Sequence, residues 1–391
     1  MTAVTSGCTF GIEEEYLLVC LDNGRVLAAP GKAVARCCET AAGPYLANEM
    51  FRSQIEIASP VFHNLHQARG FFAECRQRLA QALARQGIGL YGAASHPSAQ
   101  WLRQHPRPEP HYRQVFADYQ HVARNSLLSG LHVHVGVPME CDRMQLINRV
   151  LRWLPLFLAL STSSPLWGCQ VTGYSSYRRV ICGQWPHMNL PEPLANWADY
   201  QRYRALLQRT GALAHDGDFW WAIRPSQRYP TVELRICDAC PRLEDALCIA
   251  GLFRHLVEHC LAPGQEAAPL TDEVRWITQE NYWRAMRYGL HGLFIGVQEQ
   301  LPTTTLGWLA QLQEMYPADT PDAEHAFSHA RRIIAEGTSA DRQLQCLAQA
   351  RDAGMNEMQA MQQVVMQVLQ EGDTGATPST PPAFAADTVA L

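Results

Sequence analysis

Segments in which hydrophobic and polar residues alternate with a period of two are interspersed with longer segments of helical period along the first 260 residues. The opening segment, CTFGIEEEYLLVCLDNGRVLAAP, predicts a β-hairpin, because Asn23 and Gly24 tolerate the positive φ of a tight turn. Helices are predicted from Asn64, whose side chain can cap the first turn, to Gly87 and from Asp142 to Leu160. Further strands are predicted at 48–61, 89–95, 130–138, 219–224 and 230–237, and further helices at 198–210 and 243–261.

The other segments have less regular patterns. Residues 161–193 show no clear period and many turn formers, so a long loop is expected there, and long loops inside compact domains are usually functional. Beyond residue 270 the pattern is helical and closes with a helix from about 354 to 371. The tail, 373–391, is rich in Pro, Thr and Ala and is expected to be disordered. We therefore expect one domain over residues 1–372.

Composition and charge narrow the class of protein. The chain is 47% apolar and 18% charged, which excludes a disordered or fibrous protein. A net charge of −5 gives no electrostatic footprint for nucleic acid or an anionic membrane, so small-molecule partners are expected. The longest apolar run, Trp153 to Leu160, is far shorter than the roughly 20 residues of a membrane span. The first ten residues lack a secretory signal and the 13 cysteines lack the density of a disulfide scaffold, so we expect a cytoplasmic protein with reduced cysteines. A homo-oligomer is compatible with these features.

Acidic residues in the first two predicted strands point to a cation site. Glu13 and Glu15 share one face of a strand, where two carboxylates repel each other unless a positive charge lies between them; a solvated edge of the sheet is the alternative. Glu49 and Glu56 lie seven residues apart and would face opposite ways in a regular strand. A bulge or bend is therefore needed for both to enter one site.

Two later strands carry the same kind of pattern. His132 and His134 share a face of the strand GLHVHVG, which favours either a ligand or polar-substrate site or hydrogen-bonded core histidines. Glu233 and Arg235 share a face of TVELRI, with a buried ion pair to residues across the sheet as the alternative. Hard carboxylate oxygens with few histidines suit Mg²⁺ or Mn²⁺ better than zinc.

The spacing of Cys237, Cys240, His255 and His259 also fits the template of a C2H2 zinc site. We interpret this match as accidental, because Cys237 continues a strand and the histidines lie on an apolar helix. A domain of this size also needs no structural metal ion to be stable. No Walker loop, dinucleotide fingerprint or nucleophile elbow is present, so any phosphate must be held by metal and arginine.

Several motifs in order resemble one family. FGIEEEYLL, QIEIASPV, SGLHVHVGVP, SSPLWGCQVTGYSSYRR, TVELRICDA and ENYWRAMRYGL are similar to the motifs of the bacterial YbdK-type carboxylate–amine ligases, the type 2 glutamate–cysteine ligases, from about residue 8 to 372. This resemblance implies an α+β fold like the catalytic domain of glutamine synthetase. In that fold, a curved, mainly antiparallel sheet binds ATP and divalent metals on its concave face and has helices packed on its convex side.

The resemblance also implies roles for individual residues. Arg235, together with Arg178 or Arg179 of the long loop, would contact phosphate or a substrate carboxylate, and the sequence does not decide between the last two. His134 and Tyr174 would contact substrate or ATP, although Val171 stands where the family often has an acidic residue. The implied Mg²⁺ ligands are Glu13, Glu15, Glu49, Glu56, His132 and Glu233.

The implied reaction is ATP-dependent amide formation through an acyl phosphate, releasing ADP and phosphate. The family's usual substrates are the γ-carboxylate of L-glutamate and the amine of L-cysteine. Two alternatives remain from the residues alone: a metal-dependent hydrolase that uses the same carboxylates with His132 and His134, and a binding protein without catalytic activity.

Overall fold

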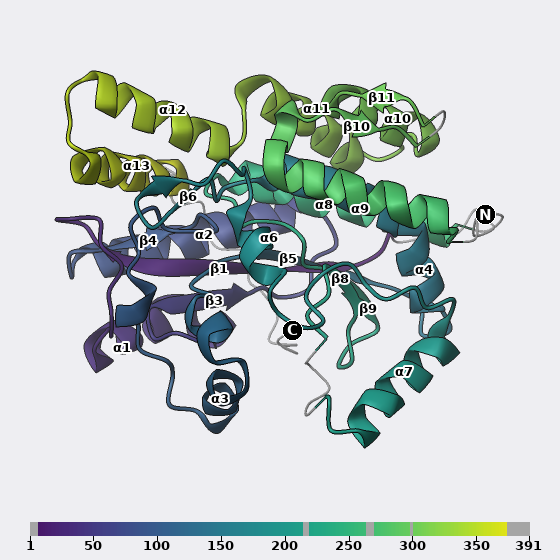
Figure 1. Cartoon of the computed structure of the whole chain (residues 1–391), viewed down its shortest axis with the longest axis horizontal. Helices are drawn as coiled ribbons and strands as arrows, with labels where there is room; N and C mark the ends of the chain where they lie inside the picture. The colour runs from purple at the N-terminus through teal and green to yellow at the C-terminus, as the bar shows by residue number, and fades with distance from the viewer. Residues whose placement is uncertain (1–6, 214–218, 263–269, 298–299, 374–391) are drawn as a thin grey trace.

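The computed structural model describes residues 7–213, 219–262, 270–297 and 300–373 (Figure 1). Its centre is a seven-stranded sheet in the order β2-β3-β1-β5-β9-β8, with β4 also paired to β1, and every one of these pairings is antiparallel. Of the predicted tail 373–391, residues 374–391 lie outside the described residues. The strands of this sheet are β1 (Phe10–Cys20), β2 (Leu46–Asn48), β3 (Gln54–Ala58), β4 (Ile88–Tyr91), β5 (Leu131–Gly136), β8 (Ile223–Pro225) and β9 (Thr231–Leu234).

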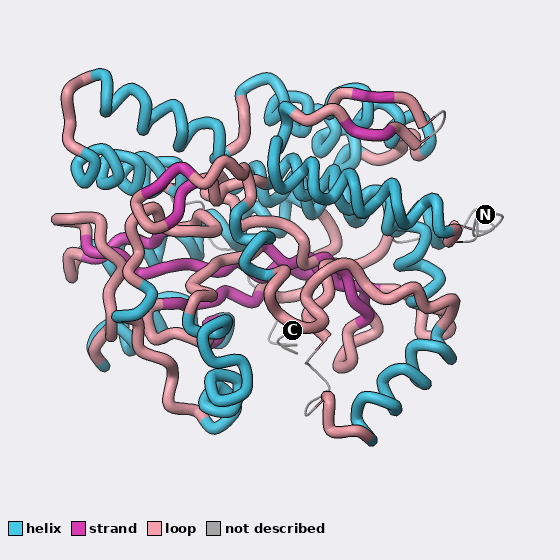
Figure 2. Tube along the Cα trace, viewed as in Figure 1, coloured by secondary structure: helices cyan, strands magenta, loops and turns pink. Residues whose placement is uncertain are grey.

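Helices lie around the central sheet, as the tube view shows (Figure 2). They are α1 (Lys32–Ala42), α2 (Leu65–Ala84), α3 (Pro110–Arg124), α4 (Arg143–Val150), α5 (Leu154–Ser161), α6 (Tyr177–Cys182), α7 (Trp197–Arg209), α8 (Leu243–Leu261), α9 (Asp272–Tyr288), α10 (Thr305–Met315), α11 (Pro321–Glu336), α12 (Ser339–Asp352) and α13 (Glu357–Gly372). Short 3-10 turns occur at 43–45, 101–103, 151–153 and 289–291.

Two long helices form the layer against the central sheet. α2 contacts β4 and α8, and α8 contacts β1 and β5. α11 packs on α8, and the α12–α13 pair closes one end with α13 against β4. Antiparallel strands backed by helices on one face confirm the predicted α+β class. Within the described residues, no helix is long and apolar enough to cross a membrane.

Local capping signals place the helix starts where the sequence predicts them. Asn64 accepts a hydrogen bond from the backbone N–H of Gln67, and Asp142 accepts from the N–H groups of Met144 and Gln145. The helix predicted up to Leu160 is interrupted, however, by a 3-10 turn before α5. Pro155, in the first turn of α5, has no N–H to continue the hydrogen-bond ladder of α4, which explains the break.

The structure corrects four other details of the prediction. The second strand of the opening hairpin is reduced to one bridge between Val19 and Val26. The segment 161–193 is not all loop, since it contains α6 and the hairpin of β6 (Leu166–Trp167) and β7 (Gln170–Val171). The region beyond 270 is not all helical, since it includes the hairpin of β10 (Phe294–Ile295) and β11 (Pro302–Thr303). The predicted strand at 48–61 is split between β2 and β3. Elements of two or three residues are too short to produce a period in the sequence.

Candidate active site

The three consecutive glutamates of β1 point to both faces of the sheet. Glu13 and Glu15 face a cavity, while Glu14 faces the helical layer and is 4% exposed. There Arg76 of α2 donates two hydrogen bonds to Glu14, of 2.5 and 2.9 Å, and the hydroxyl of Tyr16 donates a third. The alternative of a solvated edge is therefore wrong, because all three side chains lie inside the protein.

A bend in the chain brings the second pair of glutamates together. Residues 49–53 separate β2 from β3, so Glu49 and Glu56 escape the alternation of a continuous strand and line the same cavity. Glu56 lies directly opposite Glu15 in the β1–β3 pairing. The bend that the spacing requires is thus present.

The four carboxyl groups cannot all be ionised in the absence of a cation. Burial and the neighbouring Glu49 raise the pKa of Glu15 to about 8. Burial also raises the pKa of Glu49, and burial together with Glu13 raises the pKa of Glu56 well above its ordinary value. Glu13 differs: burial would raise its pKa, but contacts with His132 and His134 hold it well below the usual range.

The two histidines of β5 connect this cluster to the next strand. His132 Nδ1 lies 3.0 Å and His134 Nε2 lies 3.3 Å from the carboxylate of Glu13, and His132 Nε2 lies 3.5 Å from Glu15. Burial, followed by the nearby Arg235, lowers the pKa of His132 to about 4, so His132 is a neutral imidazole at neutral pH. Burial would lower the pKa of His134 too, but the carboxylates of Glu233 and Glu13 raise it.

Glu233 lies between two guanidinium groups. Arg224, opposite it on β8, donates from Nε at 2.6 Å and from Nη2 at 3.1 Å, and Arg235 donates from Nη1. Burial would raise the pKa of Glu233, but these two arginines hold it far below the ordinary range. Glu233 therefore forms the buried ion pair across the sheet that was the alternative, whereas Arg235 pairs with Glu233 itself. Both arginines also line the cavity.

Arg224 is a lining residue that the sequence pattern did not single out. It lies one strand away from Glu233 in the chain, and their pairing depends on the register of β8 against β9. The position of Arg224 near the end of a predicted strand was the available signal, but nothing local shows which partner it meets.

Both arginines of α6 reach the wall of the cavity. Arg178 makes two weak contacts, of 3.3 and 3.4 Å, to backbone carbonyls near the end of β9 and lies 3.7 Å from Asp238. Arg179 donates to the hydroxyl of Tyr282 at 2.8 Å and to the carbonyl of Met188 at 2.6 Å. Arg178 therefore keeps donor capacity next to the carboxylates, whereas Arg179 anchors α6 to α9.

Tyr174 is not among the residues that line this cavity. Its ring packs against Tyr177 and under the guanidinium of Arg287, 5.9 Å from the ring centre. His134 and Glu233 also stay behind the lining side chains. A direct substrate contact of Tyr174 stays a prediction.

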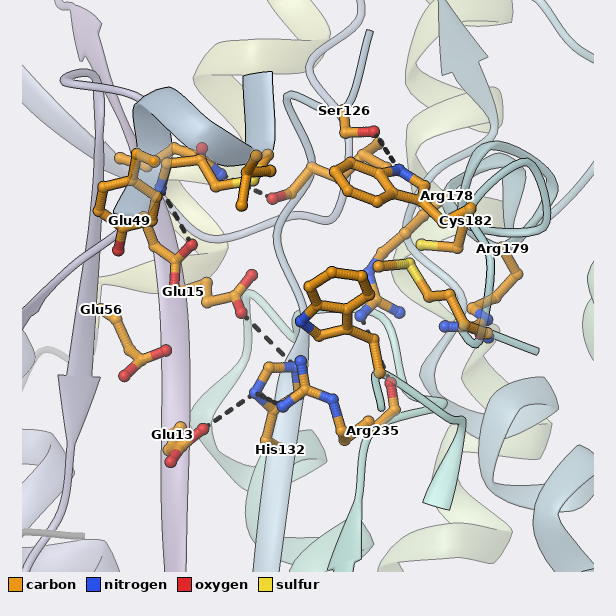
Figure 3. Close-up of a pocket in the computed structure, with 18 of the residues that line it drawn as sticks. Glu13, Glu15, Glu49, Glu56, Ser126, His132, Arg178, Arg179, Cys182 and Arg235 are labelled. Carbon is orange, nitrogen blue, oxygen red and sulfur yellow. Dashed lines mark hydrogen bonds and ion pairs between the residues drawn. The ribbon is translucent and has the colours of Figure 1, made fainter. Parts of the chain in front are cut away.

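The cavity has a volume of about 320 Å³. Acidic, basic and apolar side chains line different parts of its wall. Carboxylates form one side and arginines the other, with His132 between them (Figure 3). Trp185 and Trp220 form an apolar wall with their rings 5.5 Å apart, and Trp185 donates to the hydroxyl of Ser126 at 2.7 Å. The lining residues that the sequence analysis did not single out are Met50, Gln54, His111, Tyr112, Val115, Ser126, Leu128, Cys182, Trp185, Met188, Trp220 and Arg224.

The donor atoms fit divalent cations. Among the described residues around the cavity, ligand atoms within 4.8 Å of one another occur in three overlapping sets: Glu13–His134–Glu233, Glu13–Glu56–His132 and Glu15–Glu49–Glu56. Nε2 of His134 makes no hydrogen bond within the part of the chain that the structure describes, although it is buried. Oxygen-rich sets with at most one imidazole, together with carboxyls that stay protonated in the absence of a cation, are suited to Mg²⁺ or Mn²⁺.

Comparison with known proteins gives one consistent result. Residues 9–371 match the model of glutamate–cysteine ligase family 2. A protein of Pseudomonas entomophila provisionally named glutamate–cysteine ligase 2 is 66% identical over 94% of this chain and 97% of its own length. A protein of the same provisional name from Pseudomonas aeruginosa strain PAO1 is 44% identical over 94% of this chain and 96% of its own.

Two solved structures share the fold at low sequence identity. The glutamate–cysteine ligase of Francisella tularensis in complex with AMP has a TM-score of 0.69 at 12% identity and covers 97% of this chain and 91% of its own. A bifunctional glutathione synthetase of Pasteurella multocida has a TM-score of 0.67 at 16% identity over 94% of this chain. This chain spans about half of that longer protein, 53% of its length.

Proposed function

The chain belongs to glutamate–cysteine ligase family 2, and from this premise we propose that it joins the γ-carboxylate of L-glutamate to the amine of L-cysteine with hydrolysis of ATP to ADP and phosphate. The family identifies the chain as a carboxylate–amine ligase and confirms the resemblance in its motifs. The observation that carries the proposal is the cavity in which carboxylates of β1 and the β2–β3 bend meet the arginines that follow β9 and lie in α6.

Divalent cations belong to this proposal as partners of ATP. Glu13, Glu15, Glu49, Glu56 and His132 would hold them, with His134 and Glu233 behind Glu13. A Mg²⁺ or Mn²⁺ ion bound there supplies positive charge that neutralises phosphate oxygens and makes the γ-phosphorus more electrophilic. The elevated pKa values of Glu15 and Glu56 support this assignment, because burial and neighbouring carboxyl groups disfavour ionisation of both until a cation is bound, and at Glu15 they outweigh the nearby Arg178.

The chain's own residues position the reactants and neutralise charge. The substrate carboxylate attacks the γ-phosphorus of ATP, ADP leaves, and the amine then displaces phosphate from the acyl phosphate to form the amide. No side chain has to act as a covalent nucleophile in this sequence. Arg235 and Arg178 project N–H donors toward the carboxylate wall and would bind the anionic oxygens of phosphate or of the substrate.

The remaining polar residues would act by holding these groups in place. Glu233 fixes Arg235 and Arg224, and Tyr282 with Met188 fixes Arg179 and thereby α6. A preorganised arrangement is effective because its dipoles and charges need no reorganisation during the reaction. The apolar wall of Trp185, which is buried, and Trp220, which is half-buried, would limit access of water, which would otherwise hydrolyse the acyl phosphate.

Nothing in the comparisons supports the metal-dependent hydrolase. The structure of the Francisella ligase with AMP supports a nucleotide as a partner here. We further propose one catalytic domain over residues 1–372, supported by a core cluster that joins residues from β1 through α11. A cytoplasmic location follows from the proposed use of ATP and free amino acids.

Phosphate release from ATP tests the function directly. With Mg²⁺ and L-glutamate, release should rise strongly when L-cysteine is added, and mass spectrometry should detect γ-glutamylcysteine in amounts equal to the phosphate. Other amines at the same concentration serve as the comparison for specificity. Phosphate release without any amide product, with every amine tested, would contradict the ligase assignment.

A further inference from the structure

The last turns of α8 carry two histidines that converge on one aspartate. His255 and His259 lie four residues apart on one face of the helix, with ring centres 4.4 Å apart. His255 Nδ1 lies 3.8 Å from Oδ1 of Asp319, and His259 Nε2 lies 3.8 Å from Oδ2. Asp319 belongs to the connection between α10 and α11, so the three residues join two parts of the chain.

Both ring nitrogens that face Asp319 lack a hydrogen bond. Within the described residues, His255 Nδ1 and His259 Nε2 are buried atoms without a hydrogen-bond partner, and His255 is 3% exposed. A separation of 3.8 Å is too long for a hydrogen bond to the carboxylate. An unpaired buried polar atom destabilises a folded protein, so two such atoms aimed at one carboxylate indicate a ligand between them.

The other nitrogen of His255 sets the ring in the orientation of a metal ligand. His255 Nε2 lies 3.1 Å from the backbone carbonyl of Tyr316, an acceptor, so Nε2 carries the hydrogen and donates it. The lone pair is then on Nδ1 and points toward Asp319. Metal-binding histidines usually donate their second N–H to a carbonyl or carboxylate in this way.

We propose that His255, His259 and Asp319 bind one transition-metal ion, with Zn²⁺ as the best fit, and that water completes the coordination. The three donor atoms lie within 4.8 Å of one another. In a tetrahedral zinc site, bonds of about 2.0–2.2 Å separate neighbouring donors by roughly 3.4 Å. Asp319 is 64% exposed and can close the remaining gap by a change of rotamer, and its exposure leaves one side of the ion open to water.

A second histidine pair with the same spacing shows that spacing alone does not make this site. On α11, His329 Nε2 lies 2.8 Å from Asp245 and His325 Nε2 lies 3.0 Å from Arg69, so each ring already has a polar partner. The cysteines of the C2H2 template do not contribute either, because the possible ligand set of His255 and His259 among the described residues contains Asp319 and neither cysteine.

The ion would connect the end of α8 to the α10–α11 connection. None of the three ligands lines the cavity of the candidate active site. The ion's role is therefore to stabilise the fold, and the proposal is independent of the proposed ligase function.

Zinc titration of the chelator-treated full-length protein tests this proposal. Excess Mg²⁺ is kept present so that the carboxylate cavity is occupied, and binding is followed by calorimetry and by the thermal unfolding midpoint. We expect one zinc per chain and a higher midpoint. Co²⁺ in place of zinc should give the visible absorption bands of a tetrahedral site. Asp319→Asn and His259→Ala should each weaken binding at least ~10-fold and remove the rise in midpoint.

His325→Ala is the matched control, because it removes a histidine of the other pair and should leave zinc binding unchanged. Asp319 is exposed, so Asp319→Asn remains informative even if His259→Ala does not fold. The proposal is overturned if the wild type binds no zinc, or if Asp319→Asn and His259→Ala both bind zinc as tightly as the wild type. It is also overturned if Glu13→Gln abolishes zinc binding, because the zinc would then bind in the carboxylate cavity.

Discussion

Arg224 and Glu233 face each other across β8 and β9 and form a two-pronged ion pair at the back of the cavity. Glu233 is 1% exposed and also binds Arg235, so one carboxylate balances two guanidinium groups. Removing its charge would deprive both partly buried cations of the carboxylate that pairs with them. Truncating one partner of a buried pair typically costs several kcal/mol, because the remaining charge stays uncompensated.

Glu233→Gln should therefore lower the free energy of unfolding by about 3–5 kcal/mol, measured by urea denaturation. Glu244→Gln is the control, because Glu244 makes a similar two-pronged pair with Arg69 at the surface. Its cost should stay within about 1 kcal/mol. Equal costs for the two variants would show that burial of the Glu233 cluster carries no penalty.

Substitutions of two neighbouring glutamates of β1 should differ in their effects on ATP turnover and on the unfolding midpoint. Glu13→Gln removes a charge from the cavity and should reduce the ATP turnover of the folded enzyme at least ~10²-fold. Glu14→Gln weakens the pair with Arg76 on the other face and should lower the midpoint while the folded enzyme keeps its turnover. Normal turnover in folded Glu13→Gln would remove Glu13 from the proposed metal site.

Arg235→Lys tests whether Arg235 binds substrate. Lysine keeps the charge that Glu233 needs but loses the planar pair of donors, so kcat/KM should fall at least ~10-fold while the unfolding midpoint stays nearly constant. Arg342→Lys is the control, since Arg342 makes a two-pronged pair with Glu371 away from the cavity. Arg342→Lys should lower the unfolding midpoint and leave kcat/KM unchanged. The opposite result for Arg235→Lys, wild-type catalysis with a lowered midpoint, would assign it a structural role.

Mg²⁺ binding should compete with protons in the carboxylate cluster. The pKa of Glu15 rises from 4.5 to about 8 in the folded chain without metal, so the folded state retains a proton that the unfolded state has lost. Without Mg²⁺, this contribution to stability is complete below about pH 4.5 and is lost as the pH rises toward 8.

Because Mg²⁺ needs ionised ligands, its binding at pH 7 should release protons and its apparent Kd should fall between pH 6 and pH 8. Calorimetry in buffers of different ionisation enthalpy measures the number of protons released. Glu15→Gln should release fewer protons than the wild type. Mg²⁺ affinity that does not change over this pH range would argue against binding at Glu15.

Local signals made much of this structure predictable. The N-caps Asn64 and Asp142 and the whole of α8 lie where the sequence places them, because capping and helical period depend on residues close in the chain. The opposite orientations of Glu13 and Glu14 follow from the alternation of a strand in the same way.

Features that depend on distant partners were not predictable. Arg224 meets Glu233 only through strand register, and α6 is a six-residue helix anchored by Tyr282, a residue about a hundred positions later. The bend that unites Glu49 and Glu56 could be stated as a requirement but not located. Asp319, the third residue of the possible metal-ligand set with His255 and His259, likewise lies about 60 positions later in the chain, in the α10–α11 connection.

The carboxylates on the two faces of β1 also disfavour incorrect strand pairing during folding. A slip of β1 by one residue would reverse the direction of every side chain in it. Glu14 would then enter the cavity, while Glu13 and Glu15 would be forced into the apolar helical layer, where Arg76 could neutralise one of them. The misaligned chain would bury a carboxyl group without a partner among apolar side chains, so the carboxyl groups that build the cavity also favour the register in which it can form.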